Sequence, residues 1–229
     1  MRPALRILIL VIWAFATPAA AAEDEANAIF LVASPGLLDP NFRETVVLVT
    51  HPRDGAPWGV IINRPLDHLL SEIFSEFETF KGRKDTLFFG GPVQRDGLVF
   101  LVRSPQPPPR AVAVLRDVYF ISDIEWIDGL LRRPEPMRGL RVYSGYSGWA
   151  PGQLQSEIAR GGWHLVPADA ETVFDKDPAL IWPELIKRAG TKQTRAAPVG
   201  LPGAERLRAQ GLYQYEWRSF TNSALGIIP

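Results

Sequence analysis

"LVASPGLLDPNFRETVVLVT", residues 31–50, decides the fold because it places two short apolar runs around a polar insert. The runs "IFLVA" (29–33) and "TVVLVT" (45–50) have strand length and are rich in β-branched residues. Continuous apolar runs are typical of strands covered on both faces. In strands with one solvent-exposed face, apolar and polar residues alternate. The stretch therefore predicts two buried strands joined by a shaped loop.

A third apolar run, "WGVII" (58–62), follows the dipeptide Asp54-Gly55, which is a strong hairpin signal. We therefore expect it to lie antiparallel to the strand at 45–50. Further strands are predicted at "TLFFGGP" (86–92), "GLVFLV" (97–102), "LRVYSG" (140–145) and "WHLVP" (163–167), the first two separated by Gly-Pro and Asp-Gly turns. The proline-rich segment 104–110 predicts an irregular loop.

Helices are predicted between these strands by apolar residues at helical spacing and by capping residues. The predicted ranges are 67–78 with Asp67 as the cap, 123–131 opened by a Ser122/Glu125 capping box, 151–162, 170–174 capped by Asp169, and 178–190 closed by Gly190 with Pro183 near its start. Strands and helices mix without strict alternation, which predicts an α+β fold rather than a doubly wound sheet.

The first 22 residues have the layout of a secretory signal peptide. Arg2 and Arg6 precede an apolar run that is too short to span a membrane, and Ala20-Ala21-Ala22 precedes acidic Glu23. We predict cleavage after Ala22, which would place the mature protein in the periplasm or outside the cell with no stable membrane span. The domain would then cover residues 23–190, and residues 191–229 would form a partly ordered C-terminal extension.

Charge and cysteine content exclude several classes of function. The chain has 25 basic and 25 acidic side chains, and removal of Arg2 and Arg6 leaves 23 against 25, a formal charge of −2. Such a chain has no general attraction for nucleic acid. The chain contains no cysteine, so disulfides, thiol redox chemistry and a cysteine nucleophile are all excluded.

Five motifs of this chain resemble the bacterial YqgE/AlgH family in order and spacing, over about residues 29–190. They are "FLVASPGLLDPNFRETVVLVTH", "GVIINRPL", "FFGGPV", "GYSGWAPGQLQSEI" and "GGWHLVPAD". The resemblance implies one compact α+β domain with a bent, branched, mostly antiparallel sheet that forms a pseudo-barrel with helices packed outside. It implies no established biochemical activity, although the family is named for transcriptional regulation. Most members look cytosolic and end soon after the last helix.

The polar insert offers a first candidate ligand site. Asp39 and Arg43 could present a charged pair to a ligand, or Asp39 could cap a turn while Phe42 anchors the loop in the core. Because Pro35-Gly36 and Asp39-Pro40 are turn formers, we favour the turn interpretation.

Three more residues at strand ends are candidates. His51 matches a histidine of the resembling family and could act as a base, but a structural role as a polar linker is favoured. Asn63 could satisfy backbone groups, and Arg64 could bind an anion or form an ion pair with Asp39 or Glu44. The three scattered histidines lack metal-site spacing, so no metal or other cofactor is predicted.

The segment "GYSGW" (145–149) nearly spells the G-x-S-x-G motif of hydrolases. Trp149 stands where the motif needs glycine, and only Asp128 or Asp169 with His164 could complete a triad with Ser147. The resemblance also allows alanine in place of Ser147. We favour the interpretation that Tyr146 and Trp149 fill the core.

Taken together, these residues favour an exported, soluble, non-enzymatic binding or regulatory protein. Its ligand, a protein or a small molecule, would contact loop 34–43, Asn63-Arg64 and the turn containing Tyr146 and Ser147. An envelope hydrolase using Ser147 is the first alternative. A transcriptional regulator is the second, and it is disfavoured because an exported chain without a helix-turn-helix or a basic face would not bind DNA.

Overall fold

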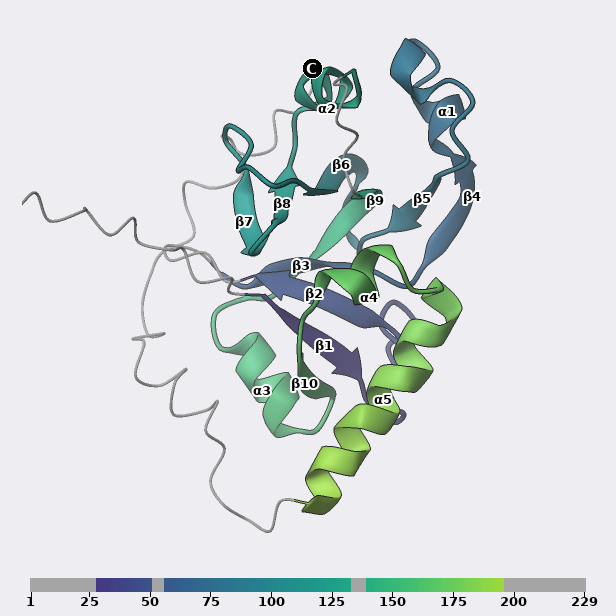
Figure 1. Ribbon diagram of the computed structural model, residues 1–229. Coiled ribbons are helices and arrows are strands. Elements are labelled where there is room, and N and C mark those ends of the chain that lie inside the picture. Colours follow the sequence, from purple (N-terminus) through teal and green to yellow (C-terminus); the bar gives the residue numbers. More distant parts are fainter. Residues whose placement is uncertain (1–27, 51–55, 133–138, 196–229) are drawn as a thin grey trace, which may run out of the picture.

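A computed structural model describes residues 28–50, 56–132 and 139–195, with side chains described as far as residue 190 (Figure 1). The predicted signal peptide, His51 and residues 196–229 lie outside the described residues. The strands are β1 (Ile29–Ala33), β2 (Val46–Thr50), β3 (Trp58–Ile61), β4 (Pro65–Leu69), β5 (Thr86–Phe89), β6 (Val93–Arg103), β7 (Val112–Leu115), β8 (Val118–Ile121), β9 (Gly139–Gly148) and β10 (Trp163–Pro167). The helices are α1 (Leu70–Ile73), α2 (Ile124–Leu131), α3 (Gln153–Ala159), α4 (Ala170–Phe174) and α5 (Pro178–Arg195), with a 3₁₀ turn at Glu78–Phe80.

The strands form one curled sheet in the order β10-β1-β2-β3-β9-β6-β8-β7. Neighbours along this path are antiparallel, and the sheet branches where β5 pairs parallel with β9 and antiparallel with β4. The curled sheet makes a half-barrel, and the helices lie outside it (Figure 1). The α+β class and the bent, branched, mostly antiparallel sheet expected from the sequence are confirmed.

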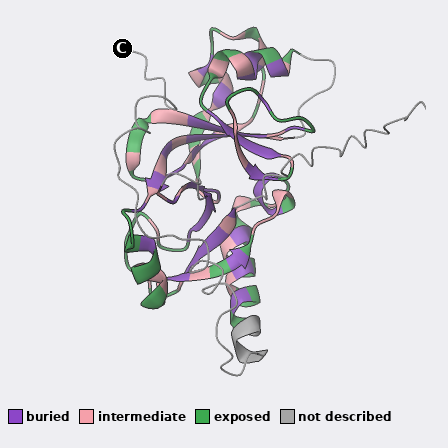
Figure 2. Ribbon diagram, turned by 90° about the vertical axis from the view of Figure 1, so that its left-hand side faces the viewer, coloured by how far each residue is buried: buried purple, intermediate pink, exposed green. Residues whose placement is uncertain are grey.

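Strands β1 and β2 are buried on both faces, as their continuous apolar runs predict. Phe30 and Val32 face a core that includes Ile181 and Leu185 of α5. Alternate residues of β1 face a second core with Leu154 of α3, because side chains of a strand alternate between its faces. Figure 2 shows the buried residues concentrated in the strands and on the inner sides of the helices. Each fully buried large apolar side chain contributes about 1.5–3 kcal/mol to folding.

The helix predicted at 67–78 is wrong. Residues 65–69 form β4, which pairs with β5, and only Leu70–Ile73 is α-helical. The helical spacing of the apolar residues has another cause: Leu70, Phe74 and Phe80 are buried in a separate small core with Phe100. Sheet pairing and this core therefore override the local pattern.

Several helix boundaries differ from those predicted. Helix α2 is capped by Asp123, whose carboxylate accepts bonds from the amides of Glu125 and Trp126, so Ser122 is not the cap. Helix α5 continues past Gly190 to Arg195, at a cost of about 1 kcal/mol for a glycine inside a helix. The cap at Asp169 is confirmed by a 2.7 Å bond from the amide of Thr172.

Two strand predictions also need correction. The hairpin β7–β8 was not predicted, although the polar pair Arg116-Asp117 separates its two apolar runs. The dipeptide Asp96-Gly97 is not a turn between strands: it lies within β6, where the register against β9 shifts. The irregular segment 104–110 contains no helix or strand, as expected.

Candidate functional site

The loop between β1 and β2 is a closed turn built on Asp39. Its carboxylate oxygen Oδ1 accepts bonds from the backbone amide of Asn41 at 2.8 Å and from the Asn41 side chain at 3.1 Å. Its backbone carbonyl accepts from the amides of Phe42 and Arg43. The turn-forming role expected for Asp39 is confirmed.

Phe42 anchors the loop against the protein, also as expected. Its ring stacks on Trp149 at a centroid distance of 6.3 Å and meets Trp163 edge-on at 5.5 Å. The hydroxyl of Thr45 donates to the Phe42 carbonyl at 2.7 Å. Aromatic pairs of this kind contribute about 0.5–1.5 kcal/mol beyond their buried area, so the centre of the loop is fixed from below.

Asn63 fixes the far end of the same loop. Its side-chain oxygen accepts a bond from the amide of Val46 at 2.9 Å, and its side-chain nitrogen donates to the carbonyl of Glu44 at 3.0 Å. The amide thus replaces a backbone partner just beyond the end of β3. This matches the expectation that Asn63 satisfies backbone groups.

Arg64 lies under the loop and donates only to backbone carbonyls. Nη1 donates to Asn41 at 2.7 Å and to Pro40 at 3.3 Å, and Nη2 donates to Arg43 at 2.8 Å. Burial, followed by the nearby charge of Arg43, lowers the pKa of the guanidinium. Among the described residues no carboxylate lies within 4.0 Å of Arg64, so the ion pair with Asp39 or Glu44, one of the two roles considered for Arg64, is not formed.

The polar side chains below the loop therefore hold its shape. The apolar side chain of Leu38 points outward with 85% of its surface exposed, the largest value among the exposed large apolar residues of the described part. The side chain of Arg43 is also exposed. The loop thus combines a fixed backbone with an uncovered leucine.

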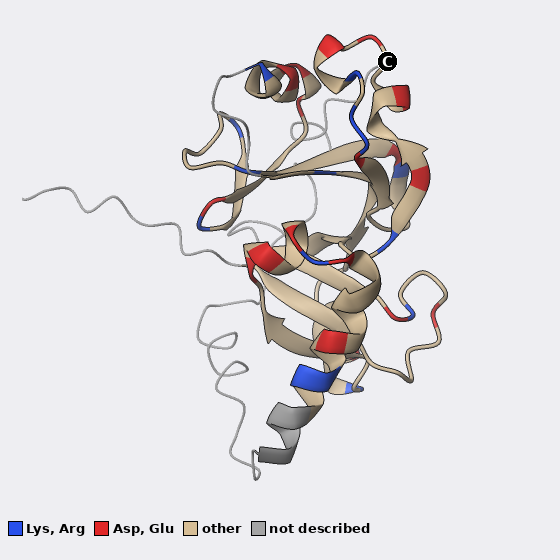
Figure 3. Cartoon of the chain, turned by 45° about the vertical axis from the view of Figure 1, so that its right-hand side comes forward, with Lys and Arg blue, Asp and Glu red and all other residues tan. Residues whose placement is uncertain are grey.

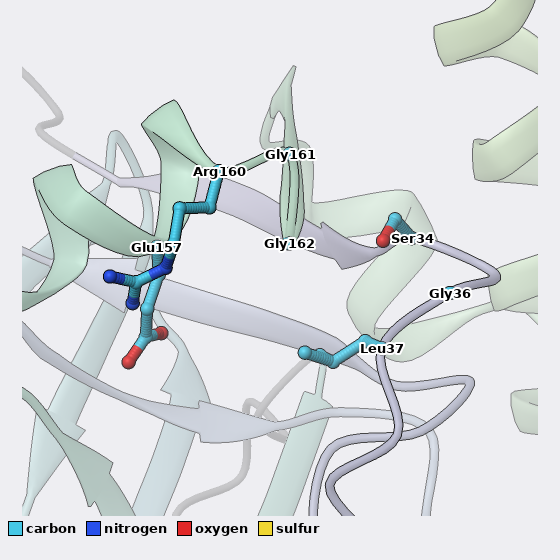
Figure 4. Close-up of a pocket in the computed structure, with 7 residues that line it drawn as sticks. All are labelled: Ser34, Gly36, Leu37, Glu157, Arg160, Gly161 and Gly162. Atoms are coloured by element: carbon cyan, nitrogen blue, oxygen red, sulfur yellow. The ribbon is translucent and has the colours of Figure 1, made fainter.

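A pocket of about 360 Å³ opens beside the loop, between residues 34–37 and the end of α3 (Figure 4). It is lined by Ser34, Gly36, Leu37, Glu157, Arg160, Gly161 and Gly162. The backbone closes its floor, because the amide of Ser34 donates to the carbonyl of Gly162 at 2.9 Å. This pocket was not predicted from the sequence; the available signal was the glycine pair Gly161-Gly162 at the end of the helix predicted at 151–162.

Glu157 links this pocket to the aromatic anchor of the loop. Its oxygen Oε2 accepts bonds from the indole nitrogens of Trp149 at 3.0 Å and Trp163 at 2.8 Å, and Oε1 accepts from Gln153 at 3.0 Å. Both carboxylate oxygens are therefore occupied by donors from the protein itself. Arg160, one turn further along, has no carboxylate within ion-pair distance among the described residues.

Ser147 lies in a crossing of two glycine motifs and is fully buried. Its hydroxyl donates to the carbonyl of Gly90 at 3.1 Å. A methyl group on Gly90 would lie 2.2 Å from the carbonyl oxygen of Gly145, and one on Gly91 would lie 2.4 Å from the Ser147 hydroxyl. The segments "FFGGPV" and "GYSGW" therefore interlock, and glycine is required for their close approach.

Tyr146 belongs to the same crossing. Its half-buried ring meets Trp58 edge-on at 6.1 Å, and burial raises the pKa of its phenol. The phenol therefore stays protonated at neutral pH and is no ready base. The predicted site residues thus form two groups, with Asp39, Arg43, Asn63 and Arg64 around the loop and Tyr146 and Ser147 in the crossing.

The residues considered for a triad do not meet. Three strands separate β9, which carries Ser147, from β10, which carries His164, in the order of the sheet, and the bond that the Ser147 hydroxyl donates goes to the carbonyl of Gly90. Asp128 accepts a 2.6 Å bond from Thr79 and pairs with Arg132, and Asp169 caps α4. Ser147 therefore lacks the base and the exposure that a nucleophile needs.

The described residues contain neither a metal-binding cluster nor a helix suited to cross a membrane. No cluster of three or more histidine and acidic side chains suits a metal ion. No helix in these ranges combines the length and the apolar character needed to cross a membrane.

Comparison with known proteins identifies the family. A family model described as AlgH-like matches residues 30–194, and the chain belongs to this family. A UPF0301 protein of Thermobifida fusca is 35% identical over 171 residues, which cover 70% of this chain and 85% of that protein. A UPF0301 protein of Mycobacterium tuberculosis is 33% identical over 175 residues, covering 74% and 85% respectively.

Two solved structures share the fold. The solution structure of the AlgH protein from Pseudomonas aeruginosa matches with a TM-score of 0.60 at 25% identity, covering 79% of this chain and 98% of that one. A crystal structure of a protein from Corynebacterium diphtheriae matches with a TM-score of 0.59 at 23% identity, covering 78% and 91%. The family is one of uncharacterised proteins, so its name adds no reaction to the geometry above.

Proposed function

We propose that this protein is an exported, non-enzymatic binding protein that contacts a partner protein through the loop 34–43. The observation that carries the proposal is the exposure of Leu38 on a loop whose backbone is held by Arg64, Asn63 and Phe42. A single exposed leucine is common on protein surfaces. Here several hydrogen bonds fix the backbone that presents it. That combination is typical of a preformed contact surface.

Preorganisation explains why such a loop would bind well. Association normally costs free energy for ordering loops and side chains, and a loop that is already fixed avoids most of that cost. Burying one leucine side chain in a partner contributes about 1.5–3 kcal/mol to the association. The pocket beside the loop would accept a second group of the partner.

A protein partner is favoured over nucleic acid. Acidic and basic residues are interspersed along the described part of the chain (Figure 3), and the formal net charge of the whole sequence is zero. Phosphate binding relies on an excess of positive charge. A regulatory role of the kind that the family name suggests would then act through protein contacts. The hydrolase alternative has no support from the geometry, because Ser147 is buried and its hydroxyl is occupied.

Export is proposed on the signal-peptide pattern of residues 1–22. The test is the mass of the protein purified from the native envelope fraction. Processing after Ala22 would leave Glu23 as the first residue. Recovery of the intact chain from the cytosol would overturn the export part of the proposal and leave the binding part to its own test.

The binding part is tested by Leu38→Ser against Leu180→Ser as a matched control. Leu180 is also exposed, at 52%, but it lies on α5. Chemical crosslinking in whole cells, followed by purification of the tagged protein, should give a defined adduct with the wild type and with Leu180→Ser. The adduct should disappear with Leu38→Ser while the melting temperature stays unchanged, and an adduct that survives Leu38→Ser would refute the proposed surface.

A further inference from the structure

Strand β10 forms an outer edge of the sheet, and among the described residues it pairs with β1 alone. The amide of Ser34 donates to the carbonyl of Gly162, so the backbone groups of His164 also face β1, because their direction alternates along a strand. The amides of Trp163 and Leu165 therefore point away from the sheet, and within the described ranges no group accepts a bond from them. A row of such unpaired backbone groups is a template for a further strand.

An apolar side chain lies exposed on the same edge. Leu165 is 43% exposed, although Trp163 and Val166 beside it are buried. Helices cover the two faces of β10, α3 on the side of Trp163 and α5 on the side of Val166, and neither is a strand that could pair with the edge (Figure 1). The strand contains no lysine, arginine or acidic residue, which are the side chains that usually keep edge strands apart. Only Pro167, which has no amide hydrogen, limits pairing at its end.

The sequence beyond α5 contains a segment suited to this edge. The five residues "YQYEW" (213–217) alternate aromatic and polar side chains, which is the pattern of a strand with one apolar face. Aromatic residues are enriched in strands, and the segment contains neither proline nor glycine. As a strand it would present three aromatic side chains to one face of the sheet.

The chain leaves the described domain from a helix that contacts β10. Helix α5 packs against both β1 and β10, and it ends at Arg195. The 17 residues 196–212 connect it to the aromatic segment, and they span up to about 55 Å when extended. The whole of α5, with 18 residues, is only about 27 Å long. The connection is therefore long enough to bring the segment to β10 in either direction.

We propose that residues 213–217 add an antiparallel strand to the free edge of β10, with Tyr215 opposite Leu165. In this register the outward amide and carbonyl of Leu165 bond to Tyr215, and the tyrosine ring covers the exposed leucine. Glu216 lies opposite His164, where its carboxylate accepts a bond from the imidazole. A slip of one residue would turn the aromatic side chains to the other face and leave polar ones over the leucine. The added strand closes an edge that is otherwise open to other chains.

Cysteine pairs in the complete chain test this register, because the natural sequence contains no cysteine. Opposite residues of an antiparallel pair have Cα atoms about 5.5 Å apart, which suits a disulfide. Leu165→Cys with Tyr215→Cys should therefore form a bond within one chain on mild oxidation, detected by gel mobility and by mass mapping of the linked peptides. The register control is Leu165→Cys with Glu216→Cys. Leu180→Cys with Tyr215→Cys controls for chance encounters, since Leu180 is 52% exposed on α5. Both controls should react about tenfold more slowly.

Hydrogen exchange tests whether the edge is paired. In the wild type the amide of Leu165 should exchange slowly, like the amide of Val166, which faces β1. Tyr215→Pro removes a donor from the added strand and disfavours its pairing, so the Leu165 amide should exchange at least about tenfold faster while that of Val166 stays unchanged. Ala209→Pro, in the connection before the segment, is the matched control and should change neither rate.

Four results would overturn the inference. They are equal rates for the three cysteine pairs, a disulfide between two chains, rapid exchange of the Leu165 amide in the wild type, and slow exchange of that amide in Tyr215→Pro. A disulfide between chains would make a second copy of the protein the occupant of the edge. The inference goes beyond the contact proposed for loop 34–43 and does not rest on it, so the Leu38→Ser experiment decides that contact separately.

Discussion

The glycine crossing and the loop 34–45 carry equally distinctive sequence motifs, but their structures differ in kind. In the crossing, Gly90 and Gly91 meet Gly145 to Ser147 so closely that an added methyl group would collide with backbone atoms. In the loop, bonds from Asp39 and from Arg64 below it fix the backbone, and the side chain of Leu38 is exposed. The comparison shows that a distinctive motif does not by itself mark a ligand site.

The physical reason is that the polar side chain of each motif forms hydrogen bonds within the protein. The sequence around Ser147 resembles a nucleophile motif, but the hydroxyl donates a hydrogen bond to the carbonyl of Gly90 in the neighbouring segment. The sequence suggests Arg64 as an anion-binding residue, but its guanidinium donates hydrogen bonds to three carbonyls of the loop. Only the loop also leaves groups facing solvent, so we assign architecture to the crossing and contact to the loop.

The largest effect is expected from Gly90→Ala in the crossing. The new methyl group would stand 2.2 Å from the carbonyl oxygen of Gly145, so the two segments must separate. We expect the free energy of unfolding to fall by more than about 3 kcal/mol in urea titrations. Gly129→Ala is the control, because that position in α2 has open space around it and should gain about 0.5–1 kcal/mol. A loss below 1 kcal/mol for Gly90→Ala would mean that the crossing is not closely packed.

A smaller loss is expected from Arg64→Ala beneath the loop. Three loop carbonyls lose a charged donor, although water can replace part of it, so we expect about 1–2 kcal/mol. Hydrogen exchange should quicken at the amides of Phe42 and Arg43, which donate to Asp39. Arg43→Ala, whose side chain is exposed, should leave both stability and exchange unchanged. Unaltered exchange in Arg64→Ala would show that the loop does not depend on the guanidinium.

The smallest change in stability is expected from Ser147→Ala. The Gly90 carbonyl that loses the hydroxyl still accepts a bond from the amide of Ile61 at 2.9 Å. We therefore expect a loss of about 0.5–1.5 kcal/mol and no change in an ester and peptide hydrolysis panel. A hydrolytic activity of the wild type that vanished in this variant, while the fold remained intact, would return Ser147 to the role of a nucleophile.

Most strands could be predicted from the sequence because short continuous apolar runs indicate buried strands. The runs at 29–33, 45–50 and 58–62 fall on β1, β2 and β3, and β2 and β3 pair antiparallel as expected. The segment 67–78 failed because Leu70, Phe74 and Phe80 converge on a core made with Phe100, which lies far along the chain. The spacing of apolar residues along the sequence indicates which residues are buried. It does not indicate which other element they pack against.

The candidate site was predictable only where side chains act on nearby backbone. The turn at Asp39 follows from neighbouring residues, and Asn63 follows from its place at a strand end. The pocket was not predictable, since Glu157 and Arg160 look like ordinary surface residues of a helix. Their role depends on how α3 lies against the loop, which only the folded chain determines.

Site-specific photo-crosslinking tests the contrast between the two regions most directly. A benzophenone amino acid is placed at Leu38 in one variant and at Tyr146, in the crossing, in another, and both are irradiated in intact cells. The account predicts a discrete adduct with a partner protein from position 38 and none from position 146. An adduct from position 146 alone would contradict it, because the crossing would then be the contact surface and the loop only a turn.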